Sequence, residues 1–244
     1  MNKKKIIGLC IAGALVVGSI GGSLAWFTSS DSITNPFATA STENNNKSIT
    51  TGLKIHENFD DTKADNTLPG DNVTKQVNVT NTATYDQLVR VKIKKQWKDA
   101  NGNVITSIWT KNGAIVPANT EGATEEKLNT DYIVLNFKNN TDGNRLTSAS
   151  DPDKGKWIQE TDAKLGNDGG YYYYYGVLAP QKNTGNLLES VTLSPNVPNE
   201  YKGLKFDVTV NAEGIQASNG AAKDSWTTAP EIITNLGAGE NQNK

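Results

Sequence analysis

Apolar and polar side chains alternate at every second position along several stretches of this chain. The clearest stretch places an apolar residue at each even position from Leu204 to Ala212, with polar residues at most positions between them. A period of two is typical of a strand that buries one face. We therefore expect one inward-facing set of residues here: Leu204, Phe206, Val208, Val210 and Ala212.

A second alternating stretch carries cationic residues at its polar positions. Apolar residues at 89, 91, 93 and 97 share one parity, whereas Arg90, Lys92 and Lys94 take the other. This pattern predicts a half-buried strand whose basic residues form a solvated face of a sheet.

Shorter apolar runs predict more strands, at residues 51–55, 73–80, 104–109, 132–137, 156–158, 171–178 and 187–193. Helical turns are expected only within 121–129 and 228–236. Turn-rich segments separate the strands, and strands do not alternate with helices along the chain. We therefore expect an all-β fold, a jelly-roll-like antiparallel two-sheet sandwich with long loops and minor short helices.

Five consecutive tyrosines, Tyr171–Tyr175, form the most unusual run within these predicted strands. Tyrosine favours strands, and alternation places Tyr172 and Tyr174 on the face opposite the other three. We expect a strand that is buried on one side and contacts a neighbour on the other. An aromatic platform for a ligand is the alternative.

The first 25 residues have the pattern of a secretory signal peptide. Lysines at 3–5 precede an uncharged stretch, 6–25, which ends in the small-x-small sequence Ser23-Leu24-Ala25. We predict cleavage after Ala25 and a secreted protein of the extracellular matrix or cell surface. A retained membrane anchor is the alternative, because 20 uncharged residues can cross a bilayer.

Removal of this segment changes the net charge of the chain and takes away its cysteine. The remaining chain has 21 basic and 26 acidic residues, a net charge of −5. It has no basic patch, so we expect no nucleic acid as a partner. The sole cysteine, Cys10, leaves with the signal peptide, so the mature chain has neither a disulfide nor a thiolate nucleophile.

The remaining residues do not form a known catalytic or metal-binding motif. His56 is the only histidine, whereas a zinc protease helix needs two histidines at i, i+4 spacing. No Gly-x-Ser-x-Gly turn supports a serine triad. Carboxylates cluster at Asp60, Asp61, Asp65 and Asp71 without a calcium-loop pattern, so we expect solvated acidic loops. We therefore expect a protein without catalytic, cofactor-binding or metal-binding residues.

A series of motifs in a fixed order links the chain to a known family. The motifs are Trp26-Phe27, Asn35-Pro-Phe37-Ala-Thr-Ala, Leu68-Pro-Gly-Asp71, Val77-Asn-Val-Thr-Asn81, Val89-Arg-Val-Lys with Trp97 and Gly102, Tyr171–Tyr175 with Val177-Leu178-Ala-Pro180, Leu188-Glu-Ser-Val191, Phe206-Asp-Val-Thr-Val-Asn-Ala-Glu213 and Ile215-Gln-Ala. In order and spacing the chain resembles the TasA/camelysin family of secreted biofilm-matrix fibre proteins of Gram-positive bacteria.

The resemblance implies a jelly-roll fold and polymerisation into extracellular fibres, in which the mature N-terminal segment inserts as a strand into the next subunit. Carried onto this chain, the donor segment is about 26–41. The expected organisation is a signal peptide (1–25), a donor-strand segment with linker (26–47), a jelly-roll domain (48–218) and a C-terminal extension (219–244). The expected partners are other copies of the chain, a signal peptidase and a minor or anchoring subunit.

The residues of the donor segment fit this expectation. Phe27, Ile33 and Phe37 share strand parity, so one face could fill an apolar groove, and Trp26 adds a further aromatic residue. Pro36 lacks an N–H and favours an edge strand or a bend. A disordered N-terminal tail is the alternative interpretation of the residues themselves.

Two other functions stay open at this point. The resemblance also brings in camelysins, which are described as casein-cleaving metalloproteases, although this chain has no metal-binding motif for that activity. A monomeric surface adhesin that uses Tyr172 and Tyr174 is the third hypothesis. Because the mature chain has no disulfide, Lys–Asn or Lys–Asp amide bonds beside a buried carboxylate could also strengthen a fibre, but the sequence does not identify the pair.

Overall fold

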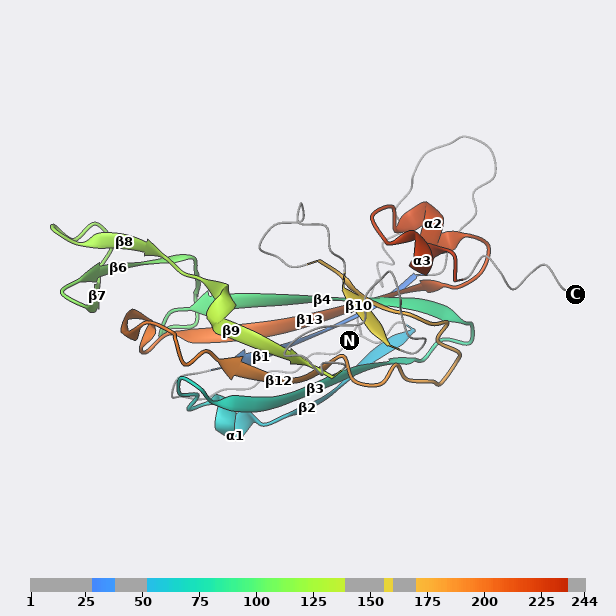
Figure 1. Ribbon diagram of the computed structural model, residues 1–244, viewed down its shortest axis with the longest axis horizontal. Helices are drawn as coiled ribbons and strands as arrows, with labels where there is room; N and C mark the ends of the chain where they lie inside the picture. The colour runs from blue at the N-terminus through green and yellow to red at the C-terminus, as the bar shows by residue number, and fades with distance from the viewer. Residues whose placement is uncertain (1–27, 38–51, 139–155, 160–169, 237–244) are drawn as a thin grey trace, which may run out of the picture.

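The computed structural model describes residues 28–37, 52–138, 156–159 and 170–236 (Figure 1). The predicted signal peptide with Ala25, and the aromatic pair Trp26 and Phe27, lie outside these ranges. Within them, the expected class is confirmed, because strands predominate and the helices are short.

Two antiparallel sheets pack face to face around one core. The first sheet has the order β1-β13-β4-β11-β10, and β5 pairs with the end of β4. The second sheet has the order β2-β3-β12-β9. The strands of the first sheet are β1 (Thr28–Phe37), β13 (Lys205–Gln216), β4 (Gln87–Lys98), β11 (Tyr172–Tyr174), β10 (Trp157–Gln159) and β5 (Val104–Ile105). Those of the second are β2 (Leu53–Phe59), β3 (Asn72–Asn81), β12 (Leu188–Leu193) and β9 (Ile133–Phe137).

The two longest strands, β4 and β13, form the centre of the first sheet. They pair along their whole length, from Lys205 opposite Lys98 to Gln216 opposite Gln87. Every residue predicted to face inward on β13 is buried in the main core, together with the apolar residues of β4. The alternation read from the sequence is therefore confirmed for both strands.

The chain passes repeatedly between the two sheets. It leaves β1 for the β2–β3 hairpin of the opposite sheet, returns for β4, crosses to β9, returns for β10 and β11, crosses to β12 and ends in β13. This repeated crossing between the two sheets is consistent with a jelly-roll-like sandwich. A one-turn helix, α1 (Asp61–Ala64), connects β2 to β3.

A separate three-stranded sheet projects from one end of the sandwich (Figure 1). It has the order β7-β6-β8, with β6 (Ser107–Lys111), β7 (Ala114–Val116) and β8 (Thr124–Lys127). Asn112 and Gly113 both have positive φ and make the tight turn between β6 and β7. The helical turns expected at 121–129 are wrong, because residues 124–127 pair with β6 and gain cross-strand hydrogen bonds there. One 3₁₀ turn follows, Thr130–Tyr132.

A second, smaller core covers the outer face of the first sheet at the other end. Two short helices, α2 (Ala221–Ser225) and α3 (Glu231–Thr234), lie over this face (Figure 1). Trp226 packs there against Tyr173 of β11, with ring centroids 6.1 Å apart. The helix expected within 228–236 is confirmed, although it is only one turn long.

The helical cover corrects one expectation about the basic face of β4. Lys94 is exposed as expected, but the guanidinium of Arg90 lies 3.9 Å from the ring of Tyr171 and 4.6 Å from that of Trp226. Arg90 also donates two hydrogen bonds to Glu213. This end of the face is therefore closed by aromatic rings, because the chain returns after β13 and packs Trp226 onto it.

Candidate assembly site

β1 is the edge strand of the first sheet and is held there by main-chain pairing. Its ten residues pair with β13 without a register shift, from Thr28 opposite Ile215 to Phe37 opposite Phe206. Among the described residues, no strand of the same sheet lies on its other side. The edge position predicted from Pro36 is confirmed, since a residue without an N–H is tolerated where no further strand has to be bonded.

The alternation of β1 brings two described side chains between the sheets. Asp31 is 6% exposed, and Ile33 is half-buried against the main core. Ser32, with the opposite parity, is exposed. Phe37 shares the parity of Ile33 and pairs with Phe206, which is buried in the core. Of the residues predicted for the apolar face of the donor segment, Ile33 thus lies on the inward face of β1, whereas the side chains of Phe27 and Phe37 are outside the described part of the structure.

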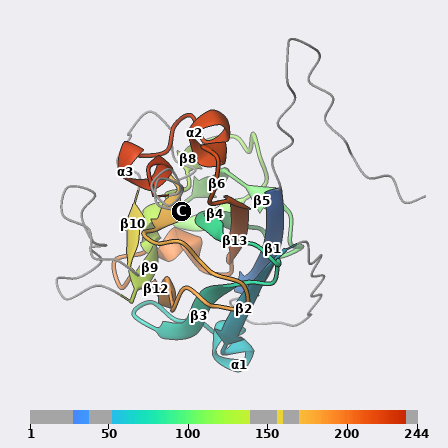
Figure 2. The ribbon, with the colours of Figure 1, turned by 90° about the vertical axis from the view of Figure 1, so that its right-hand side faces the viewer.

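Asp31 joins β1 to the edge strand of the opposite sheet. One carboxylate oxygen accepts a hydrogen bond from the backbone N–H of Ile55 on β2, at 2.7 Å, and the other accepts from the N–H of Ser32, at 2.9 Å. Figure 2, which looks along the sandwich, shows β1 beside β13 at the side where β2 also lies. Asp31 therefore bridges two edge strands that have no ladder between them.

A buried ion pair lies on the adjoining hairpin. Lys75 of β3 is fully buried, and its ammonium donates a hydrogen bond to Glu57 of β2. The ammonium also lies 5.2 Å from the ring centroid of Phe59. Burial lowers the pKa of Lys75 from its ordinary value, and the neighbouring Glu57 carboxylate acts in the opposite direction.

The two residues that flank 38–51 lie at opposite ends of the sandwich. Phe37 is level with Phe206 and, through it, with Trp97 at the end of β4. The carbonyl of Gly52 accepts a hydrogen bond from the side chain of Gln87 at the start of β4, at 2.9 Å. Ten residues of strand separate Gln87 from Trp97, which corresponds to about 33 Å.

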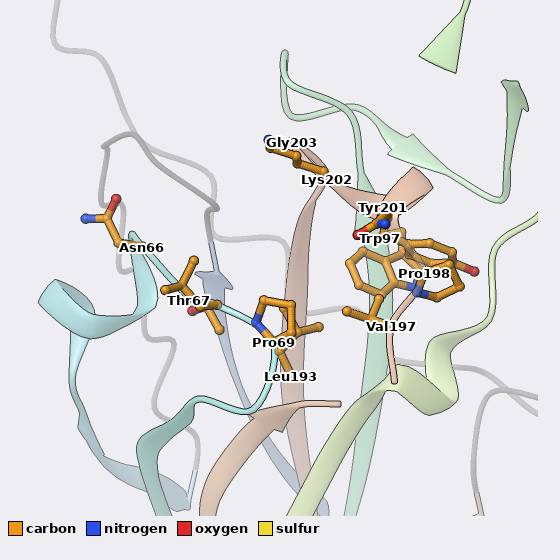
Figure 3. Close-up of a pocket in the computed structure, with 12 residues that line it drawn as sticks. Asn66, Thr67, Pro69, Trp97, Leu193, Val197, Pro198, Tyr201, Lys202 and Gly203 are labelled. Carbon is orange, nitrogen blue, oxygen red and sulfur yellow. The ribbon is translucent and has the colours of Figure 1, made fainter. Parts of the chain in front are cut away.

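An apolar pocket opens at the Trp97 end, with a volume of about 470 Å³ (Figure 3). The indole of Trp97 forms its floor, with the ring of Tyr201 edge-on at 5.0 Å. Leu193 and Val197 contribute further apolar surface, and Leu68 on the rim is 66% exposed. The walls lack a group of converging charged side chains, so the pocket is suited to an apolar side chain.

The residues considered for catalysis do not converge in the described part of the chain. There, groups of three or more histidine, cysteine, aspartate or glutamate side chains able to hold a metal are absent. His56 is exposed on β2. Asp60 caps α1, and Asp71 accepts a hydrogen bond that closes the preceding turn. Asp151 and Asp153, two further carboxylates close together in the sequence, lie outside the described ranges.

The tyrosine strand is mostly internal. Tyr172 lies in the main core and Tyr174 packs against it, whereas Tyr173 lies in the second core. The predicted strand with contacts on both sides is confirmed. Burial raises the pKa of Tyr172 to about 12.

Sequence reasoning did not single out Asp31, Glu57 or Lys75. A signal was present for two of them: Asp31 shares parity with Ile33, and Lys75 interrupts the apolar series Val73, Val77, Val79. Charged residues at apolar positions indicate paired interior charges or polar contacts between strands.

No helix among the described residues is long and apolar enough to span a membrane. Comparison of this chain with protein-family models, with curated proteins and with solved structures found no match.

Proposed function

We propose that this chain is a secreted structural subunit that polymerises head to tail into extracellular matrix fibres. In the fibre, the β1 segment of each copy takes the β1 position in its neighbour, beside β13. The observation that carries the proposal is the position of β1: an edge strand that the chain can replace with the same strand of another copy without changing any other pairing.

The chain connection favours this exchange. Within one chain, the two residues that 38–51 must connect, Phe37 and Gly52, lie at opposite ends of the sandwich. Fourteen residues can span about 50 Å at most, against roughly 33 Å between the two ends. The same residues are long enough to join the Phe37 end of one subunit to the Gly52 end of the next. Exchange therefore needs no further length of chain.

The contacts of β1 suit recognition by strand addition. The ladder to β13 supplies main-chain hydrogen bonds, which give affinity without depending on sequence. Ile33, which packs against the main core, supplies an apolar contact. Asp31 fixes the register of β1 relative to β2, because a shift of β1 by two residues would leave the buried N–H of Ile55 without this acceptor. Trp26 and Phe27 would extend the same segment at its start.

The apolar pocket fits the same arrangement. It lies at the Trp97 end, where the exchanged strand of a neighbour would leave the subunit. In a head-to-tail chain this end meets the Gly52 end of that neighbour. The pocket would then lie at the boundary between subunits and bury apolar surface there.

The proposal includes the other expectations from the sequence. These are export with cleavage after Ala25 by a signal peptidase, an extracellular location, a minor or anchoring subunit as a partner, no binding of nucleic acid and no enzymatic activity. Among the described residues, no metal-binding cluster favours the metalloprotease alternative. No pair of exposed tyrosines there favours the adhesin alternative. Casein digestion that a chelator abolishes would restore the protease alternative.

The decisive experiment compares the mature chain, 26–244, with a chain that starts at residue 42. Negative-stain microscopy should show filaments only for the first. A synthetic peptide of residues 26–41 should bind the shorter chain and raise its melting temperature, because it refills the vacant position beside β13. The same peptide with Ile33→Asp is the matched control and should bind weakly.

Filaments of equal length and number from both chains would contradict the proposal. Failure of the mature chain to form filaments under any condition of concentration and pH would contradict it as well.

A further inference from the structure

The turn that joins β3 to β4, residues 82–86, lies at the end of the sandwich opposite the apolar pocket. The backbone N–H groups of Thr82 and Ala83 donate hydrogen bonds to the carbonyl of Gly52, at 3.0 and 3.2 Å. Gln87, the residue after the turn, is separated from Trp97 in the pocket by ten residues of strand, or about 33 Å. The turn of one chain therefore cannot reach the pocket of the same chain.

Buried amide side chains brace this turn from the inside. Asn81 is completely shielded from solvent, and its amide nitrogen donates hydrogen bonds to the carbonyls of Tyr85, at 2.8 Å, and Leu178, at 2.7 Å. Its oxygen accepts hydrogen bonds from the N–H of Ala83 and from the side chain of the buried Gln87, both at 2.9 Å. A turn that is fixed before binding loses little conformational entropy when a partner covers it.

The outer side of the turn combines polar groups with one aromatic residue and one acidic residue. Thr82, Thr84 and Asp86 are exposed, and Tyr85 is half-buried. Asp86 is the charged residue of the turn. Tyrosine is enriched at protein interfaces, because it offers a large apolar ring together with a hydroxyl group. The turn is therefore a projection that a complementary pocket can receive.

The pocket at the Trp97 end is complementary to this projection. Its volume of about 470 Å³ is in the range of clefts that enclose a small ligand, so it has room for an aromatic ring. Figure 3 shows Pro69 on one side of the pocket and the rings of Trp97 and Tyr201 on the other. Lys202, the charged residue among those that line the pocket, is exposed. The pocket thus offers apolar and aromatic walls and one cation, whereas the turn offers an aromatic residue and one anion.

The course of β3 and β4 aligns the turn of one copy with the pocket of another. At the Gly52 end, residues 82–86 connect the end of β3 to the start of β4. At the Trp97 end, Pro69 shortly precedes β3 and Trp97 lies near the end of β4, and both residues line the pocket. The same two strands therefore lead to the turn at one end and to the pocket at the other. Two copies stacked head to tail with their strands in line bring the turn of one against the pocket of the next.

We propose that the pocket at the Trp97 end binds the β3–β4 turn, residues 82–86, of the neighbouring copy. In this contact Tyr85 packs against Trp97, and Asp86 lies beside Lys202. The proposal rests on the proposed function, because a head-to-tail fibre is the arrangement that brings these two ends together. The turn is then a second contact between subunits, in addition to the β1 strand, and it limits the rotation of one subunit relative to the next.

The first test uses the absence of cysteine from residues 26–244. Thr84→Cys and Leu68→Cys place one thiol on the exposed turn and one on the exposed rim of the pocket. A disulfide forms only between Cα atoms within about 7 Å, so it reports direct contact. Filaments of the doubly substituted mature chain, treated with a mild oxidant, should give a ladder of linked multimers on a non-reducing SDS gel.

The controls for this test change one thiol at a time. Each single variant has one thiol per subunit and should give no ladder, because one disulfide can join only two chains. Thr84→Cys combined with Ile115→Cys, at an exposed position of β7, is the matched control. It has two thiols per subunit and should give no ladder either.

The second test reverses the two charges. Asp86→Lys and Lys202→Asp should each raise the critical concentration for filaments about threefold, because each places like charges together. The two changes combined should restore the critical concentration to within about twofold of the wild-type value. Lys202→Asp combined with Asp224→Lys, on the exposed side of α2, is the matched control and should not restore it. The melting temperature of each unassembled variant confirms that it is folded.

Abundant wild-type filaments, without a ladder in the first test or restoration in the second, would overturn this inference and leave the proposed function standing. The pocket would then hold a different part of the neighbour or another ligand. Failure of the wild-type chain to form filaments would instead contradict the proposed function. A ladder from a doubly substituted chain that starts at residue 42 would support this contact and exclude strand exchange as the basis of assembly.

Discussion

The carboxylate of Asp31 accepts a hydrogen bond from the backbone N–H of Ile55, and this contact joins the edge strands of two different sheets. β1 and β2 have no main-chain ladder between them, so their relative position depends on side chains. A buried N–H that loses its acceptor costs on the order of 1–3 kcal/mol. The contact therefore sets which residue of the β1 segment lies opposite β2, in one chain or between two copies.

Asp31→Ala should lower the free energy of unfolding by about 1–3 kcal/mol, because the N–H of Ile55 stays buried without an acceptor. Denaturant unfolding of the mature chain measures this value. Ser32→Ala, at the exposed neighbouring position, is the control and should change the free energy by less than about 0.5 kcal/mol. Equal decreases in the free energy of unfolding for the two variants would show that Asp31 does not fix the register of β1 relative to β2.

Ile33→Asp should abolish filament formation, because it places a second carboxylate on the inward face of β1 beside the core. Ser32→Asp adds the same charge to the exposed face and should leave filaments intact. Microscopy and sedimentation of the two variants at equal concentration provide the measurement. Filaments from Ile33→Asp as abundant as those from the unchanged chain would argue against insertion of this face.

Trp226→Ala should destabilise the protein by about 3–5 kcal/mol, because it removes the largest side chain that the C-terminal helices contribute to the second core. Lys223→Ala on the exposed side of α2 is the matched control and should be close to neutral. Thermal unfolding of the two variants measures the difference in their melting temperatures. A melting temperature unchanged by Trp226→Ala would mean that residues after 218 do not contribute to the stability of the sandwich.

The stability of the protein should fall as the pH rises from 10 to 12, in part through Tyr172. Burial raises the pKa of its hydroxyl to about 12, so the folded state holds the proton at pH values where the unfolded chain releases it. The contribution is fully present below pH 10 and is lost as the pH approaches the folded pKa. Denaturant unfolding of wild type and Tyr172→Phe across this range gives the difference, which should be constant below pH 10 and should favour Tyr172→Phe increasingly above it.

Leu68→Asp should weaken assembly more than folding. Leu68 lies on the rim of the apolar pocket and is largely exposed, so the monomer loses little buried surface. If the next subunit covers this rim, the critical concentration for filaments should rise about tenfold, equivalent to roughly 1.4 kcal/mol. Ile115→Asp, an exposed apolar residue of β7, is the control for added charge and should have no such effect. A critical concentration that both changes raise equally would exclude the pocket from the boundary.

The alternation of residue types predicted the strands that form the centre of the fold. The bounds of β4 were predicted to within two residues at each end, whereas β13 continues four residues beyond the predicted Ala212, to Gln216. Both strands have many consecutive positions at which apolar and polar side chains alternate. The segment 121–129 was wrongly expected to be helical, because its run of polar residues has no apolar period and only the ladder with β6 makes it a strand.

By itself the sequence determined which residues of a strand share a face, because side chains alternate along any extended backbone. Which of those faces is covered was decided only by the tertiary structure, since the covering groups come from distant parts of the chain. Tyr171 and Trp226 pack over the guanidinium of Arg90. The carboxylate of Asp31 accepts a hydrogen bond from Ile55 on the other edge strand, and Lys75 donates one to Glu57 on the neighbouring strand. Contacts of this kind depend on register and on the approach of the sheets, and neither is encoded in the period of a single strand.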